Sequence, residues 1–468
     1  MSVTNALLDE TRRLATEYLE SLPTRRVGAP ATVEQLRESL DLPLTPNGVD
    51  PLVVIRDLHH AALPGLTASS GPRYFGFVIG GTLPAAVAAD WLTTAYDQNA
   101  GIYATSPLAS VVEEVAAKWI LQLLGLPSSA SVGFVTGCQM ANFTALAAAR
   151  HGVLRRVGWD VEARGIVDAP RISILIGGEA HVTIHTSLRL LGFGTDAARR
   201  IETDDQGRMR PDRLAEALKE LHGPVIVCAQ AGDVNSGAFD DLAAIARLCR
   251  PAGAWMHVDG AFGLWARASS SRQQLANGAE LADSWATDGH KWLNVPYDNG
   301  IVIVADPLAH RGAMAVQAPY IEQAAPTVRD PLEFVPEFSR RARGLPLYAA
   351  LRSLGKNGVA DLIDRSCEHA MQFAALLGRE PGVQILNDVS LNQVLVRFEG
   401  ADPGASDALT RGVIRRVQQE GTCWLGGTTW QKRAAMRISV SGWMTGKEDV
   451  RQSAEAILRC LRSERGTT

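Results

Sequence analysis

The stretch Thr287-Asp288-Gly289-His290-Lys291-Trp292 places a lysine just after a short run, residues 283–287, that has the composition of a strand. A second run, Trp255-Met256-His257-Val258-Asp259, also has the pattern of a strand and ends in a carboxylate. Short runs of this kind that alternate with helices predict a mostly parallel sheet, and ligands collect at the carboxyl ends of its strands. We therefore expect Lys291 and Asp259 to meet at one edge of a sheet.

A lysine and an aspartate in this arrangement suit the chemistry of pyridoxal 5′-phosphate (PLP). The lysine can form a Schiff base with the cofactor aldehyde, and the aspartate can keep the pyridine nitrogen protonated so that the ring accepts electrons. Burial beside the cofactor would also lower the pKa of Lys291 from its usual value of about 10.4. Each residue has an ordinary explanation too, because lysines after strands are mostly solvated and aspartates often cap turns or helices.

The composition describes a chain long enough for more than one domain, with 468 residues of which 46% are hydrophobic. Its formal net charge of −4 gives no reason to expect nucleic acid or an anionic membrane as a partner. The six cysteines are scattered without a CxxC pair, so we expect no metal site and a reducing, cytoplasmic location. No apolar run reaches about 18 residues, and residues 1–13 lack the pattern of a signal peptide.

The chain divides into three predicted parts. Residues 1–104 form a proline-broken arm and a pocket segment, which would bury little surface alone and is expected to wrap a partner subunit. Residues 105–344 alternate helices with short strands and form the expected PLP-binding domain. Residues 345–468 have the pattern of a smaller α+β domain. The expected strands are 132–136, 172–176, 225–229, 255–259, 283–287 and 300–304 in the large domain, and 383–386, 393–398 and 436–440 in the small one.

Two strand-to-helix junctions offer further groups for the cofactor. Gly137 allows a close approach of the backbone, and Cys138 and Gln139 begin a helix whose first N–H groups suit a phosphate. His181 follows Gly177-Gly178-Glu179-Ala180 at another junction, from which an imidazole could stack on the cofactor ring. Taken alone, the first junction is also an ordinary turn and the second an ordinary helix start.

A series of segments in one order makes the sequence resemble the group II PLP-dependent decarboxylases, the family of aromatic amino-acid and glutamate decarboxylases, in a bacterial-type branch. The resemblance covers nearly the whole chain. The matching segments are residues 74–77, residues 104–107 with Glu113 and Glu114, residues 137–142, Ala180 with His181, residues 232–240, residues 257–261, residues 290–292 and the RR-x-R segment, residues 340–343.

The resemblance implies a role for each matching position. As catalytic residues, Lys291 would carry the Schiff base, Asp259 would pair with the pyridine nitrogen and His181 would stack on the ring. Ala261 would pack on the other ring face, and Asn235 would contact substituents of the cofactor. The remaining cofactor positions would be Gly137, Cys138, Gln139 and His290 around the phosphate, and the substrate pocket would contain Phe75, Phe77 and Thr82. The family has the type I fold of aspartate aminotransferase, and its members are homodimers that exchange their N-terminal arms.

The implied activity is that of a PLP-dependent lyase of amino acid metabolism, which decarboxylates an aromatic or bulky apolar L-amino acid. One departure leaves alternatives open. Aromatic decarboxylases of the family carry a loop tyrosine shortly before the RR-x-R segment, where this chain has Pro331, and Tyr320 is the nearest tyrosine upstream. An oxygen-consuming aldehyde synthase, aldol cleavage, transamination and an inactive binding protein are therefore alternatives. The roles of Asp288, which replaces an asparagine, of Arg437 and of residues 424–430 also stay open.

Overall fold

The computed structural model describes residues 3–316 and 328–466, which form two compact units. The terminal unit contains the described residues up to 79, residues 372–385 and those from 396 onward. The sheet unit contains residues 386–395 and the described part of 80–371. These units group the chain differently from the three predicted ranges, because the N-terminal arm belongs with the C-terminal region. The three-part division and the exchange of the arm between subunits stay predictions.

The sheet unit is built on seven strands in the order β1-β7-β6-β5-β4-β2-β3. Neighbouring strands run parallel except around β7, which is antiparallel to both β1 and β6. This confirms the predicted, mostly parallel sheet. The sequence pattern does not predict β3, because this short edge strand contains two exposed arginines. The strands are β1 (Ser131–Val135), β2 (Ser173–Gly177), β3 (Ala198–Ile201), β4 (Val225–Gln230), β5 (Trp255–Asp259), β6 (Ser284–Asp288) and β7 (Gly300–Val304).

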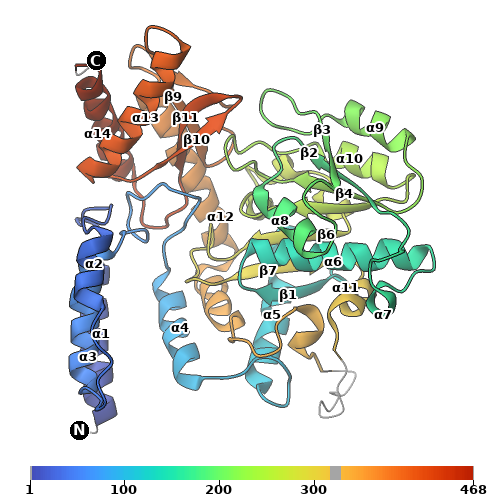
Figure 1. The fold of residues 1–468 in the computed structure, drawn as a ribbon, viewed down its shortest axis with the longest axis horizontal. Coiled ribbons are helices and arrows are strands. Elements are labelled where there is room, and N and C mark those ends of the chain that lie inside the picture. Colours follow the sequence, from blue (N-terminus) through green and yellow to red (C-terminus); the bar gives the residue numbers. More distant parts are fainter. Residues whose placement is uncertain (1–2, 317–327, 467–468) are drawn as a thin grey trace. The chain divides into compact units, whose positions relative to one another are not determined.

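Both faces of this sheet are covered, since every residue of β1, β5, β6 and β7 is buried. Helix α6 (Cys138–Arg156) contacts β1, β4, β5, β6 and β7, and Figure 1 shows it running along the sheet. Because α6 begins directly after Gly137, its N-terminus lies at the carboxyl end of β1. The other helical segments within this unit are α4 (Pro84–Tyr96), α5 (Pro107–Leu124), α7 (Val161–Arg164), α8 (Val182–Leu190), α9 (Pro211–Lys219), α10 (Leu242–Cys249), α11 (Pro307–Met314) and the 3-10 turns η2 (Gly263–Ala268), η3 (Gln273–Ala276), η4 (Ala279–Leu281) and η5 (Pro331–Phe334).

The terminal unit contains a sheet in the order β10-β11-β9-β8. Three of its strands overlap the predicted ones, whereas β10 is not predicted because its sequence, Gly-Gly-Thr-Thr-Trp, lacks an apolar run. Trp430 at the end of β10 is 1% exposed and belongs to the core of this unit. The elements are α1 (Val3–Ser21), α2 (Val33–Leu40), α3 (Pro51–Ala62), η1 (Leu63–Gly65), β8 (Val383–Ile385), β9 (Gln393–Phe398), α13 (Pro403–Glu420), β10 (Gly426–Trp430), β11 (Arg433–Ser439) and α14 (Lys447–Arg465), with β9 continuing from the range of the sheet unit.

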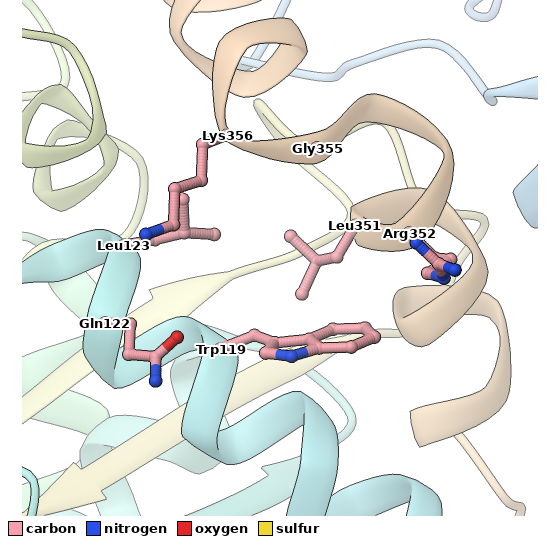
Figure 2. Close-up of a pocket in the computed structure, with 7 residues that line it drawn as sticks. All are labelled: Trp119, Gln122, Leu123, Leu351, Arg352, Gly355 and Lys356. Carbon is pink, nitrogen blue, oxygen red and sulfur yellow. The ribbon is translucent and has the colours of Figure 1, made fainter.

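Helix α12 (Gly344–Leu377) breaks at Gly355, as the sequence predicts. The φ of this glycine is 61°, in the left-handed region that glycine adopts without strain. A pocket of about 250 Å³ lies beside the break. Figure 2 shows residues that line it, among them Trp119 of α5 and Leu351 of α12. None of the residues that line this pocket is a predicted site residue.

A buried ion pair joins the segment of Glu113 to the RR-x-R segment. Arg340 Nη1 lies 2.5 Å from Glu113 Oε1, and neither side chain is more than 1% exposed. Arg340 also donates to the backbone carbonyls of Ala100 and Phe134. Since Phe134 belongs to β1, these bonds hold in place the strand that leads into Gly137.

All six cysteines are buried and free. Within residues 3–316 and 328–466, no helix combines the length and the apolar content that a membrane crossing requires.

Candidate active site

The candidate site lies where β1, β5 and β6 end. Lys291 follows β6, and its Nζ lies 3.0 Å from Oδ2 of Asp288, the last residue of that strand. Burial alone would lower the pKa of Lys291, but the Asp288 carboxylate, with Cys138 and Asp259 nearby, raises this pKa above its ordinary value. The lowered pKa expected from the sequence applies to Lys291 beside its bound cofactor and stays a prediction.

The N-terminus of α6 faces the same carboxylate. The N–H of Cys138 donates to Asp288 Oδ1 at 2.6 Å. Space at this turn depends on two glycines: a Cβ on Gly137 would come within 3.2 Å of the His290 ring, and a Cβ on Gly300 would come within 2.4 Å of the Gly137 backbone. The turn therefore leaves little room for a side chain at Gly137 and none at Gly300, and the Cys138 N–H is its backbone donor.

His290 is held as a neutral imidazole with a defined proton position. The N–H of Asn299 donates to Nδ1 at 3.1 Å, so the ring proton belongs on Nε2. Burial lowers the pKa of His290, which favours the neutral ring. Nε2 lies 3.5 Å from Asp288 Oδ1, and the ring stacks on Tyr297 with centroids 4.3 Å apart. His290 can therefore offer an N–H to an anion beside Cys138.

Asp259 ends a chain of buried hydrogen bonds. Trp255 Nε1 donates to Ser284 Oγ at 2.8 Å, and this hydroxyl lies 3.0 Å from His257 Nδ1. His257 Nε2 lies 2.9 Å from Asn142 Oδ1, and Asn142 Nδ2 donates to Asp259 Oδ2 at 3.2 Å. Because indole and amide N–H groups can only donate, every bond is satisfied when each residue donates toward Asp259. Burial lowers the pKa of His257 to about 4, so its ring is neutral, as this direction requires.

His181 is the N-cap of α8. Its Nδ1 accepts from the Thr183 N–H at 3.4 Å and lies 2.9 Å from Thr183 Oγ1, which places the ring proton on Nε2. Asn142 Nδ2 lies 3.2 Å from the same hydroxyl, so hydrogen bonds link His181 to Asp259. The ordinary explanation, a helix start, therefore holds for His181, and capping also orients its ring. Its stacking on a cofactor stays a prediction.

Three further predicted cofactor contacts lie around this centre. The Gln139 side chain turns toward α8, where its amide donates to a serine hydroxyl at 3.1 Å, so only its backbone N–H remains for a phosphate. Ala261 follows β5, and its N–H donates to Asp259 Oδ1 at 3.2 Å. Asn235 lies in the loop after β4, where its N–H donates to Asp233 Oδ1 at 2.8 Å. Their roles toward the cofactor stay predictions.

Thr82 lies in a segment that is tied to the residues after Lys291. The neighbouring Gly81 N–H donates to Asn294 Oδ1 at 2.5 Å. A Cβ on Gly80 would come within 1.9 Å of the Lys291 carbonyl oxygen, so this close approach requires glycine. The structure thus places Thr82 next to the lysine segment.

Phe75 and Phe77 belong to the terminal unit. Phe75 is completely buried, with its ring centroid 4.9 Å from that of Phe373, in the core of this unit. Phe77 is 58% exposed, and its ring packs against Trp424 at 5.5 Å with the Arg437 guanidinium 6.0 Å from its centroid. Trp424 and Arg437, whose roles the sequence leaves open, therefore gather around Phe77. The pocket roles of Phe75 and Phe77 stay predictions.

The residues of the sheet unit fit PLP. A partly buried lysine stands beside two donors suited to a phosphate, the Cys138 N–H and His290 Nε2–H. A buried carboxylate, Asp259, ends the adjacent strand. Asp288, whose carboxylate accepts the Cys138 N–H, has the wrong charge for a phosphate neighbour. Among the described residues, no group of three or more histidine, cysteine, aspartate or glutamate side chains is arranged as a metal site.

The matching segments include Asn142 and His257 but gave them no role, and Ser284 lies outside these segments. All three are completely buried polar side chains. That placement is itself a signal, because buried polar groups are almost always hydrogen-bonded. Their partners, however, come from distant parts of the sequence.

Comparisons with known proteins point to one family. The model of the pyridoxal-dependent decarboxylase conserved domain matches residues 34–399. The chain is similar to an aromatic-L-amino-acid decarboxylase from Bacillus atrophaeus, with 26% identity over 449 residues that cover 94% of this chain and 91% of that protein. It is also similar to an L-2,4-diaminobutyrate decarboxylase from Rhizobium meliloti (strain 1021), with 30% identity over 380 residues that cover 80% of this chain and 74% of that protein.

A third relative matches this chain both in sequence and through a solved structure. A 4-hydroxyphenylacetaldehyde synthase from Rhodiola rosea is 25% identical over 449 residues, which cover 93% of this chain and 90% of that protein. A crystal structure of the Rhodiola rosea synthase matches with a TM-score of 0.87 at 22% identity, covering 99% of each chain. The chain has the type I fold of PLP-dependent enzymes, and its cofactor is PLP. Because the family model spans most of its length, this chain belongs to the pyridoxal-dependent decarboxylase family.

Proposed function

We propose that this protein decarboxylates an aromatic or other bulky apolar L-amino acid, with Lys291 as the residue that carries PLP. The observation that supports this most is the placement of the partly buried Lys291 and the buried Asp259 at the ends of the adjacent strands β6 and β5. The start of α6 supplies an N–H at the same edge of the sheet. Membership of the decarboxylase family supports the choice of reaction.

When bound, PLP supplies an aldehyde that links to an amine and a ring that accepts the electrons of a bond broken at Cα. The chain prepares this chemistry. Lys291 is held as an ammonium by Asp288 and has to release its proton before its amine can act as a nucleophile. Asp259 would hold a proton on the pyridine nitrogen, and the N–H groups of Asn142 and Ala261 that donate to its carboxylate orient it.

Two histidines would orient the cofactor and the substrate. The Nδ1 atom of each ring accepts a backbone N–H, from Thr183 onto His181 and from Asn299 onto His290. Each ring therefore carries its proton on Nε2 and can act as a donor. His290, with the Cys138 N–H, would hold the phosphate, and His181 would lie against the ring and the substrate carboxylate.

A second candidate activity is oxygen-consuming aldehyde synthesis. Pro331 stands where aromatic decarboxylases of the family have their loop tyrosine, and it is buried in η5. Tyr320, the nearest tyrosine upstream, lies outside the described residues. Without a proton source there, the reacting Cα would be open to oxygen, and one relative of this chain is an aldehyde synthase. Aldol cleavage, transamination and an inactive binding role are further alternatives.

The protein is also proposed to be a cytoplasmic homodimer that exchanges its N-terminal arm. Large apolar side chains are exposed on two helices of the sheet unit, among them Trp91, Leu92 and Tyr96 of α4 and Leu108 of α5, each 44–52% exposed. Exposed apolar surface of this kind marks protein interfaces. Light scattering after size-exclusion chromatography would measure the mass, and Trp91→Glu combined with Leu108→Glu should produce monomers. The net charge of −4 gives no reason to add a nucleic acid or a membrane as a partner.

The test of the reaction is a panel of L-amino acids incubated in air with purified, PLP-loaded protein. Amine and aldehyde are measured by mass spectrometry, and hydrogen peroxide by a coupled assay. Amine without peroxide supports decarboxylation, whereas aldehyde with peroxide supports the second candidate. If PLP is bound but neither product forms, the decarboxylase proposal is wrong, and aldol cleavage and transamination assays separate what remains.

A further inference from the structure

Asp288 is a buried carboxylate among the donors that a phosphate would use. Its Oδ1 accepts from the Cys138 N–H at 2.6 Å, and its Oδ2 lies 3.0 Å from Lys291 Nζ. His290 Nε2 is 3.5 Å from Oδ1. The Asp288 side chain is only 2% exposed, so water cannot replace these partners. A carboxylate and a phosphate at this turn would share one set of donors.

The backbone of Asp288 leaves the carboxylate little freedom to withdraw. The Asp288 N–H donates to the Ala261 carbonyl at 3.0 Å, and the Asp288 carbonyl accepts from Trp265 Nε1, also at 3.0 Å. The residue also pairs with Gly300 in the ladder between β6 and β7. Because the strand end is held on both sides, only rotation of the side chain can move the carboxylate. A phosphate at the Cys138 N–H therefore meets this carboxylate at close range.

The charges around Asp288 cannot balance two anions. Burial lowers the pKa of His290, and burial raises the pKa of Cys138 and of Tyr297, so all three side chains are neutral near pH 7. The titratable side chains around Asp288 are Lys291, His290 and Tyr297 between β6 and β7, Cys138 on α6 and Asp259 on β5. Among them, Lys291 is the cation, and Asp259 adds negative charge. When two anionic groups share a site, one of them takes up a proton.

We propose that Asp288 couples phosphate binding to the uptake of one proton. The phosphate takes over the Cys138 N–H, and the Asp288 carboxylate takes a proton from solvent and becomes a neutral acid that can donate to a phosphate oxygen. This inference rests on the proposed PLP site and adds a pH dependence to it, because the protein then holds its cofactor more tightly as the pH falls. Asp288 is thus a positioning residue that sets the pH range of cofactor retention.

The test uses pyridoxine 5′-phosphate, which carries a phosphate but no aldehyde. Isothermal titration calorimetry at about pH 8, in two buffers of different ionisation enthalpy, gives the number of protons taken up per ligand. Wild type should take up about one proton more than Asp288→Asn. The variant should also bind at least about tenfold more tightly, because one linked proton changes affinity about tenfold per pH unit. The control is Asp306→Asn, which removes the same charge from the N-cap of α11, keeps a capping side chain and should match wild type.

Equal proton uptake by wild type and Asp288→Asn would overturn the inference, as would weaker binding by the variant. Failure of wild type to bind the probe, or binding that PLP does not displace, would reject the proposed cofactor site as well. Wild type alone provides a second measurement with a phosphate monoester such as glycerol 3-phosphate, whose own second ionisation near pH 6 is almost complete above about pH 7.5. Its affinity should fall about tenfold per pH unit there, and a flat profile would overturn the inference even if the variant failed to fold.

Discussion

Glu113→Gln removes one charge from a completely buried ion pair, so we expect it to destabilise the sheet unit strongly. Glu113 Oε1 and Arg340 Nη1 are 2.5 Å apart, and solvent cannot reach either side chain to replace a lost partner. Arg340 would keep its bonds to the Ala100 and Phe134 carbonyls but would carry an uncompensated charge. Arg329 Nη2, 4.0 Å from Glu113 Oε2, would lose the same counterion. Removal of one partner from such a pair costs about 3–5 kcal/mol of unfolding free energy.

Thermal unfolding followed by circular dichroism would measure this loss. For a unit of this size, 3–5 kcal/mol corresponds to a decrease of about 5–10 °C in Tm. Glu114→Gln is the matched control, because it removes the same charge from an exposed neighbouring residue and should change stability by less than about 0.5 kcal/mol. Since Phe134 lies in the strand before Gly137, Glu113→Gln should also release PLP at lower temperature. If Glu113→Gln and Glu114→Gln proved equally stable, the reasoning from burial would be refuted.

Lys291→Ala should abolish turnover and the visible absorbance of lysine-linked PLP while leaving circular dichroism unchanged. Retained turnover would show that another lysine carries the cofactor. His257 should make stability depend on pH: its pKa is about 4 in the folded protein against 6.5 in the unfolded chain, so the unfolded chain binds the extra proton between these values. The free energy of unfolding should therefore fall as the pH drops from about 6.5 to about 4, by on the order of 3 kcal/mol from this residue. Urea unfolding of His257→Gln should show a shallower pH dependence than that of wild type. An equal slope would contradict the lowered pKa of His257. Tyr297→Phe should shift the products from amine toward aldehyde by at least about tenfold, because the Tyr297 ring stacks on His290, the residue before Lys291, and its hydroxyl is the group that we expect to protonate Cα. An unchanged product ratio in air would show that another group protonates Cα.

Local patterns in the sequence were sufficient to predict the strands whose ends carry the site residues. The apolar runs predict β5 and β7 with the bounds that the structure has, because a strand buried on both faces is a continuous hydrophobic run. Parallel strands end at one edge of a sheet, so the order of strands and helices along the chain is enough to place Lys291 and Asp259 together. The edge strand β3 and the polar strand β10 were missed because neither has such a run.

By itself, the sequence determined the mostly parallel sheet, the turn at Gly137 and the strand ends that carry Lys291 and Asp259, since these depend on local composition and chain direction. Only the tertiary structure decided which buried groups face one another. It paired Asp288 with Lys291 and the Cys138 N–H, and against the effect of burial this pairing raises the pKa of Lys291. It also joined Asn142 and His257 behind Asp259. A pKa or a donor direction depends on neighbours within a few ångström. Asp288 is only three residues from Lys291, but the pairs Cys138–Asp288 and Asn142–Asp259 join segments that are more than a hundred residues apart in the chain.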